Sequence, residues 1–174
     1  EQTKEPTDLW TGQELRRSLS DNSSPALTDF YLFMADRANH IKNTIEPMID
    51  RGSIVVTDRY ADSTRAYQPV ILSETDYFDS QQEAREFIES SMKPWLVKPD
   101  ITIYLDIPVS VALDRVNSGE KYETRQILTK VKENYDALID QQPERFIVID
   151  GTQSKQDVLK EARAALSLPT LDKI

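Results

Sequence analysis

Three short segments of the chain each carry a near-continuous run of β-branched or aromatic residues and end in an aspartate. They are SIVVTD at 53–58, DITIYLD at 100–106 and RFIVID at 145–150. Strands that are apolar on both faces are typical of parallel sheets covered by helices on each side. The pattern therefore predicts an α/β protein whose strand ends, each with its aspartate, share one edge of a parallel sheet. Ligands of such proteins bind at that edge, although Asp106 and Asp150 fit equally well as caps of the turns that follow.

A long amphipathic helix is predicted at 25–50. Its apolar residues recur every three or four positions, at Leu27, Phe30, Met34, Ala38, Ile41, Ile45 and Met48. Ser24 and Pro25 suit the N-cap and the first helical position, and Pro47 should kink or shorten the last turns. Phe33 and Arg37 lie four residues apart on a face beside the apolar stripe, so packing of the stripe does not explain this aromatic and cationic pair.

The remaining segments between the strands are also helical in pattern. We expect helices at about 12–20, 78–92, 108–117, 124–141 and 154–166. Polar residues 117–125 separate two of them and form either a flap or a simple connector. Each predicted strand is thus followed by enough helix for a parallel crossover connection.

Composition narrows the function classes. The 174 residues suit a single domain at 1–174, and they include no cysteine and one histidine, His40. Disulfides and thiolate metal sites are thereby excluded, and little scope remains for histidine metal sites or a Ser-His-Asp triad. The net charge of −9 argues against a surface that coats nucleic acid. No apolar run approaches the roughly 20 residues that cross a bilayer, so we expect a cytoplasmic protein without a membrane partner.

The segment DRYADSTRAYQ at 58–68 holds the most suggestive chemistry. Asp58 and Arg59, at the end of the first predicted strand, form either a mutual salt bridge or half of a ligand site. Arginine forks match phosphate oxygens, and carboxylates orient arginines or hold Mg²⁺ through water. The basic candidates near this edge are Arg16, Arg37, Arg59, Lys121 and Arg125, and the acidic ones are Glu5 and Asp58. Thr64, Tyr67 and Gln68 offer groups for a sugar or base, or for ordinary capping. The residues by themselves thus predict a parallel α/β protein that binds a phosphorylated small molecule.

Several segments resemble the thymidylate kinase family. The resemblance covers nearly the whole chain. TKEPTD resembles the family's T-R-E-P-G-G segment, LFMADR its F-x-x-x-R helix and DRYADSTRAYQ its D-R-Y/H signature. KPDITIYLDIPVSVALDR resembles its P-D-L-T-I-Y-L-D-V segment, and EKYE stands in the lid. The resemblance implies a three-layer α/β/α P-loop kinase fold, in one nucleoside monophosphate kinase domain with a short lid around 117–125. It also implies transfer of a phosphoryl group from ATP to dTMP with Mg²⁺, in dTTP biosynthesis, by a homodimer packed through helices such as 25–50. The acidic composition and the TKEPTD variant look archaeal.

The same resemblance implies a role for each candidate residue. Phe33 would stack on thymine and Arg37 would bind its edge, while Arg16 and Arg59 would hold the phosphate.

Other roles follow in the same way. Asp58 would organise Mg²⁺ and the transferring phosphate, and Glu5 would face the nucleotide sugar or the metal. Thr64 and Gln68 would contact the base, and Tyr67 would crowd the position of a ribose 2′-hydroxyl. In the lid, Lys121 stands where many members have arginine, with Arg125 one helical turn away.

One departure qualifies the resemblance. The 174 residues contain no G-x-x-x-x-G-K-[S/T] phosphate loop and lack the family's opening strand. We expect these parts to exist in the native protein. The alternatives are a catalytically inactive nucleotide-binding paralogue, or a related nucleoside or nucleotide kinase with another base preference.

Overall fold

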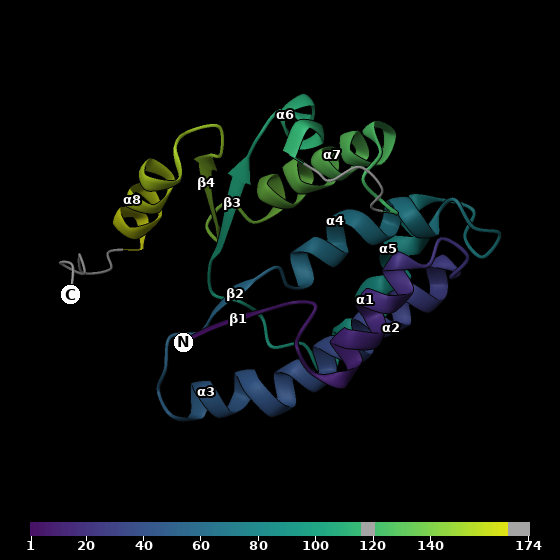
Figure 1. The fold of residues 1–174 in the computed structure, drawn as a ribbon, viewed down its shortest axis with the longest axis horizontal. Coiled ribbons are helices and arrows are strands. Elements are labelled where there is room, and N and C mark those ends of the chain that lie inside the picture. The colour runs from purple at the N-terminus through teal and green to yellow at the C-terminus, as the bar shows by residue number, and fades with distance from the viewer. Residues whose placement is uncertain (116–120, 167–174) are drawn as a thin grey trace.

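The computed structural model describes residues 1–115 and 121–166. Residues 117–120 of the predicted lid therefore lie outside the described residues. The strands are β1 (Gln2–Lys4), β2 (Val56–Asp58), β3 (Thr102–Asp106) and β4 (Phe146–Asp150) (Figure 1). The helices are α1 (Trp10–Ser20), α2 (Ala26–His40), the π-helical η1 (Ile41–Ile45), α3 (Glu46–Asp50), α4 (Ala61–Leu72), α5 (Gln81–Met92), α6 (Val109–Arg115), α7 (Arg125–Gln141) and α8 (Lys155–Ala165).

The strands pair in parallel, as predicted, but in two separate pairs. Among the described residues, β1 pairs with β2 and β3 pairs with β4, each as a two-stranded sheet. All three predicted strands form. The sequence pattern misses β1, because Gln2–Lys4 is polar and becomes a strand only by pairing its backbone with β2. Asp58 and Lys4 are paired at the carboxyl end of one sheet, and Asp106 and Asp150 at that of the other.

The predicted helices are confirmed to within a few residues, with three local differences. Residues 61–72 form a complete helix, α4, which contains Pro69. The helix at 25–50 continues through the π turn η1 just before Pro47, which lies in the first turn of α3. A widened turn at this point accommodates the proline ring without ending the helix. Ser24 is not the N-cap of α2: that position is Pro25, and the Ser24 hydroxyl bonds Ser18 and Asp29 instead.

The apolar stripe of α2 forms the centre of the main core. Phe30, Met34, Ile41 and Ile45 are buried there, together with residues of α4 and α5. Helix α1 packs on α2, and α4 packs between α5 and α7. Within the described part of the chain, no helix is both long and apolar enough to span a membrane.

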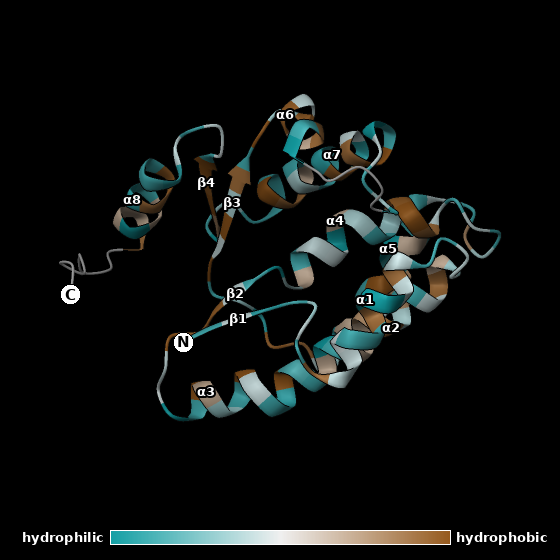
Figure 2. Cartoon of the chain, in the orientation of Figure 1, coloured by the Kyte–Doolittle hydropathy of each residue, from teal (hydrophilic) through white to brown (hydrophobic). Residues whose placement is uncertain are grey.

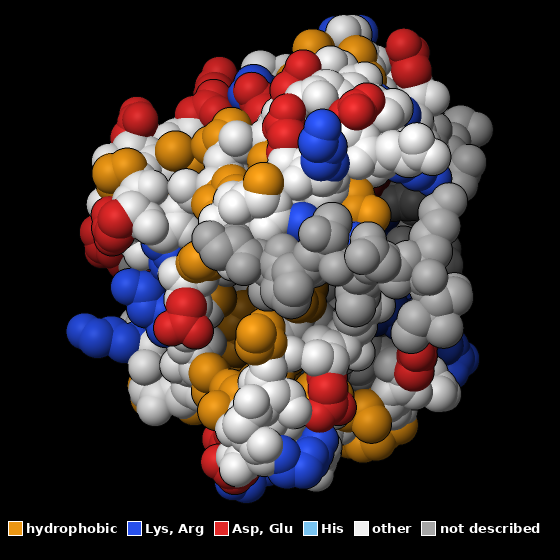
Figure 3. All heavy atoms as spheres, turned by 90° about the vertical axis from the view of Figure 1, so that its left-hand side faces the viewer, with side chains coloured by type: hydrophobic (Ala, Val, Ile, Leu, Met, Phe, Trp, Pro, Cys, Tyr) orange, Lys and Arg blue, Asp and Glu red, His pale blue; other side chains and the backbone are white. Residues whose placement is uncertain are grey.

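The two sheets are less covered than the apolar runs predict. Both β3 and β4 are apolar along most of their length (Figure 2), yet Leu105 and Val148 are about half exposed, as is Val56 on β2. On the side of the molecule shown in Figure 3, apolar side chains gather around a hollow. These three apolar side chains are therefore less buried than the sequence pattern predicts.

Candidate active site

A cavity of about 520 Å³ lies among the β1–α1 loop, α1, α2, α4 and residues 121–123. Nine of the eleven predicted site residues line it, namely Glu5, Arg16, Phe33, Arg37, Arg59, Thr64, Tyr67, Gln68 and Lys121. The volume falls in the range typical of small-molecule sites. Asp58 and Arg125 are not in the lining: Asp58 is exposed at the end of β2, and Arg125 is exposed at the first position of α7.

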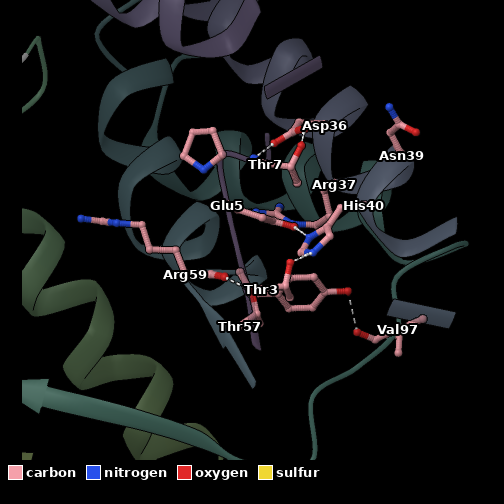
Figure 4. Close-up of polar contacts among 12 residues, drawn as sticks. Thr3, Glu5, Thr7, Asp36, Arg37, Asn39, His40, Thr57, Arg59 and Val97 are labelled. Carbon is pink, nitrogen blue, oxygen red and sulfur yellow. Dashed lines mark hydrogen bonds and ion pairs between the residues drawn. The ribbon is translucent and has the colours of Figure 1, made fainter. Parts of the chain in front are cut away.

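One wall of the cavity is a buried polar network centred on Glu5 (Figure 4). Arg37 donates from Nε (3.0 Å) and Nη2 (2.7 Å) to Glu5 Oε2, and from Nη1 to Thr64 Oγ1 (2.8 Å). The second carboxylate oxygen, Oε1, lies 3.0 Å from Nδ1 of His40. The ring of Tyr60 lies 5.3 Å from the guanidinium carbon. The charge of Arg37 is therefore buried, but it is paired and hydrogen-bonded.

Three side chains offer contacts to a flat ring. Phe33 is partly buried and packs on the edge of the core, so one part of its ring remains on the cavity wall. Thr64 and Gln68 lie one turn apart on α4 and point to the same side. The Gln68 Oε1 atom is buried and, among the described residues, has no hydrogen-bond partner. A buried acceptor left unpaired costs free energy, so this oxygen is open to a donor from a ligand or from water.

The two other arginines of the cavity lie apart from that buried network. Arg59 has a φ of +60°, a conformation that is costly for residues other than glycine and is common at functional sites. Its side chain extends away from Glu5, Arg37 and His40 (Figure 4), and its guanidinium carbon lies 5.8 Å from the centre of the Tyr67 ring. Arg16 donates to the Pro6 carbonyl oxygen at 2.9 Å. Each guanidinium keeps further donors for an anion.

Lys121 lines the cavity, but its ammonium group binds α2 and the turn before it. It donates to Asp29 Oδ2 (2.8 Å), to the Ser24 carbonyl (2.5 Å) and to the Asp21 carbonyl (3.5 Å). The hydroxyl of Tyr122 donates to the same Asp29 oxygen. Burial raises the pKa of Asp29, but hydrogen bonds from Lys121 and other donors outweigh burial and hold that pKa below its usual value. The three donors of Lys121 are thus engaged away from the cavity centre.

A family model described as thymidylate kinase matches residues 2–162. The chain belongs to the thymidylate kinase family. The prediction made from the TKEPTD, LFMADR and DRYADSTRAYQ segments is thereby confirmed, and with it a P-loop kinase type of α/β fold.

Curated relatives agree with this assignment. A probable thymidylate kinase of Halobacterium salinarum (strain ATCC 29341 / DSM 671 / R1) is 40% identical over 165 residues, which are 95% of this chain and 80% of the relative. A probable thymidylate kinase of Methanococcoides burtonii is 38% identical over 168 residues, covering 95% of this chain and 81% of the relative. A thymidylate kinase of Desulfovibrio desulfuricans is 32% identical over 180 residues, covering 94% and 79%. Archaeal proteins are thus among the relatives, in line with the archaeal character of the sequence.

The family's use of Mg²⁺ can be compared with the carboxylates present. No group of three or more metal-binding side chains occurs at residues 1–115 or 121–166. Both oxygens of Glu5 already accept hydrogen bonds, from Arg37 and His40. Asp58 has an exposed carboxylate at the end of β2. Asp58 can therefore accept a hydrogen bond from a metal-bound water, whereas Arg37 and His40 already engage most of the acceptor positions of Glu5.

Several residues of the site are absent from the sequence-based prediction. His40 contacts Glu5 from a position three residues after Arg37, on the same face of α2. Tyr60 and Ser63 line the cavity from the DRYADSTRAYQ segment, and Tyr122 and Glu123 line it from EKYE. These four residues lie within motifs of the sequence analysis, and that position was the only sequence feature that could have identified them. For His40 the only signal was its helical spacing from Arg37.

Proposed function

We propose that the cavity is the dTMP site of an ATP-dependent thymidylate kinase. One observation carries the proposal: Phe33, Arg37 and the unpaired Gln68 Oε1 line a single cavity, at which Arg16 and Arg59 supply positive charge. An aromatic face, a donor and an acceptor match a pyrimidine that has both a carbonyl and an N–H. The arginines match a phosphate.

The base end selects thymine over cytosine through Arg37. Thymine presents an acceptor at O4 and a donor at N3, which suit a guanidinium N–H and the Gln68 oxygen. Cytosine presents an amino group at position 4. The Gln68 amide can turn to offer its NH₂ group instead, but a guanidinium only donates, so Arg37 and the amino group would face each other unpaired.

The other end holds the sugar and phosphate. Tyr67 lines the cavity with its ring 5.8 Å from the guanidinium carbon of Arg59, and we expect this ring to crowd a ribose 2′-hydroxyl. Arg59 and Arg16 would hold the phosphate with charge-assisted hydrogen bonds. The side chain of Arg59, whose backbone has a φ of +60°, extends away from Glu5 (Figure 4).

Positioning and charge account for most of the chemistry of phosphoryl transfer. The phosphate of dTMP is already a nucleophile and needs no general base. ATP would supply the phosphoryl group, and Mg²⁺ held near Asp58 would supply positive charge to it. Arg59 and Arg16 orient the attacking phosphate oxygen, and Asp58 would hold a metal-bound water. The exposed Tyr31 and Ile49 give the α2–α3 face apolar area for a homodimer contact.

Nucleotide binding to the 174-residue chain tests the proposal. Calorimetric titration should give the tightest dissociation constant for dTMP, a weaker one for dUMP and the weakest for dCMP. The step from dTMP to dUMP should be about fivefold to tenfold, because only one methyl group is lost. Gln68→Leu should weaken dTMP binding, whereas Gln82→Leu, on the exposed face of α5, should not. Equal affinity for dCMP and dTMP, or no binding of either, would refute a thymidylate site.

A further inference from the structure

His40 lies outside the cavity lining and is buried, with 1% of its surface exposed. Its Nε2 lies 2.7 Å from Thr3 Oγ1, and its Nδ1 lies 3.0 Å from Glu5 Oε1. Thr3 and Glu5 are two residues apart in and just after β1, so both side chains face α2. His40 therefore joins β1 to the carboxylate that binds Arg37 (Figure 4).

The direction of these hydrogen bonds follows from Glu5. Its Oε2 accepts two hydrogen bonds from the permanently charged Arg37, so the carboxylate is ionised and can only accept. The Nδ1 atom of His40 must then carry a proton and donate to Oε1. In a neutral ring, Nε2 is left to accept from the Thr3 hydroxyl, which fixes the tautomer.

Glu5 in turn fixes the plane of the guanidinium. Arg37 uses Nε and one Nη2 proton on Glu5, and its two Nη1 protons on Thr64 and Met92. Of the five N–H donors of the group, one on Nη2 remains. A carboxylate held only by Arg37 could rotate about its last torsion angle and carry the guanidinium with it. With Oε1 also held by His40, both groups keep one orientation.

We propose that His40 is a positioning residue for base selection, acting through Glu5 to aim the remaining N–H of Arg37 into the cavity. This inference rests on the proposed function in taking the base of dTMP as the group that Arg37 reads. His40 does not touch the nucleotide. It holds the remaining N–H of Arg37 in one direction, and the choice between thymine and cytosine depends on that direction.

A matched pair of substitutions separates positioning from packing. In His40→Asn the amide nitrogen takes the place of Nδ1 and still donates to Glu5. In His40→Gln the amide nitrogen takes the place of Nε2 and reaches Thr3 instead. His40→Leu removes both contacts and keeps an apolar side chain of similar bulk. Each variant is checked for folding by its thermal unfolding curve.

The first readout needs no nucleotide. In ¹H–¹⁵N spectra of the wild-type protein, the Nε–H of Arg37 should be slow to exchange with solvent, and the His40 ring should carry a proton on Nδ1. The Arg37 signal should persist in His40→Asn and should broaden or shift in His40→Gln and His40→Leu. An unprotonated Nδ1 in the wild type would overturn the proposal even if no variant folds.

The second readout is the ratio of dissociation constants for dCMP and dTMP. It should fall about tenfold in His40→Gln and His40→Leu, the effect of one misdirected hydrogen bond, and should stay near the wild-type value in His40→Asn. A ratio unchanged in all three variants, or lost equally in all three, would overturn the proposal. If the wild-type chain binds no dTMP, the proposed function fails, while the Arg37 signal still decides whether His40 positions that side chain.

Discussion

The burial of Arg37 differs from what its position in the helical pattern predicts. The pattern places it beside the apolar stripe, on a face that burial does not explain. In the structure only 2% of its surface is exposed, because Glu5 arrives from β1 and pairs with it. A buried arginine without such a partner would strongly destabilise the fold. Here the partner lies 32 residues away in the chain.

Phe33 is the residue whose substitution tests base stacking most directly. Phe33→Ala should weaken dTMP binding about 5- to 150-fold, since stacking of one base on an aromatic ring contributes about 1–3 kcal/mol. Tyr77→Ala provides the control, because Tyr77 is an exposed aromatic residue that does not line the cavity. Titration of both variants with dTMP is the measurement. Equal affinity of Phe33→Ala and the control would show that the ring only packs against the core.

Lys121 offers a choice between two roles. If it stabilises the transferring phosphoryl group, Lys121→Ala lowers kcat and leaves stability unchanged. Its hydrogen bonds to Asp29 and to the carbonyls before α2 favour a different result. We expect Lys121→Ala to lower the free energy of unfolding by about 1–3 kcal/mol, because a fully buried carboxylate loses a charged donor.

Urea denaturation of Lys121→Ala, Asp29→Asn and the double variant checks this role. The two changes should be strongly non-additive, since they remove the same contact. Lys130→Ala serves as the control, because Lys130 pairs with Glu74 on the surface. Additive losses of stability would show that Lys121 and Asp29 do not act through their contact, and would favour the phosphoryl-transfer role for Lys121.

At the scale of elements, the loop between β1 and α1 is held in place by α2. Asp36, buried on α2, accepts hydrogen bonds from the backbone N–H and hydroxyl of Thr7 and from the hydroxyl of Thr11. These bonds fix the segment that brings Glu5 and Pro6 to the cavity. The position of Glu5 therefore depends on the packing of α1 against α2.

Gly12 lies where α1 meets the backbone of Thr7 in the preceding loop. A Cβ atom at Gly12 would lie 2.1 Å from the carbonyl oxygen of Thr7, a backbone atom that cannot move aside freely. Alanine normally stabilises a helix by about 1 kcal/mol over glycine, yet Gly12→Ala should destabilise the protein and weaken dTMP binding. Thermal unfolding and titration of this variant, with Glu14→Ala on the exposed side of α1 as control, are the measurements. A rise in melting temperature would contradict the prediction.

At the scale of the whole molecule, one buried ion pair connects the β3–β4 sheet to the cavity side. Arg145, just before β4, donates to both oxygens of Asp62 on α4, at 2.6 and 2.9 Å. Thr102 at the start of β3 donates to the same carboxylate at 2.7 Å. Helix α4 also carries Thr64, Tyr67 and Gln68, so this pair helps to fix the substrate wall against the second sheet.

Loss of Asp62 should be costly for stability. Asp62→Ala leaves the Arg145 charge buried without its partner, and we expect a loss of about 3–5 kcal/mol in the free energy of unfolding. Asp136→Ala, which removes an exposed partner of Lys132, should cost about 1 kcal/mol or less. Denaturant titration of the two variants is the comparison. Similar losses in both would show that the buried pair contributes no more than a surface one.

The same pair predicts how stability depends on pH. Burial raises the pKa of Asp62, but the hydrogen bonds from Arg145 and Thr102 outweigh burial and set that pKa below its ordinary value of 3.8. The stabilisation is therefore present above pH 3.8 and is lost as pH falls through the lower pKa of the folded state. Asp62→Asn should flatten this acid limb in denaturation curves measured from about pH 5 downward. If stability falls with pH in Asp62→Asn as it does in the wild type, other carboxylates cause the acid sensitivity.

By itself the sequence determined the local features: helices with an apolar face, three apolar strands, their parallel pairing and the motifs of a thymidylate kinase. These depend on periodicity and on residues close together in the chain, such as Phe33 with Arg37 or Thr64 with Gln68. It also predicted nine of the residues that the structure brings together around one cavity. Only the tertiary structure decided the pairings between distant segments: β1 with β2, Glu5 with Arg37 and His40, and Lys121 with Asp29. Pairings of this kind depend on which side chains meet after the chain has folded, and no local pattern of apolar and polar residues encodes that.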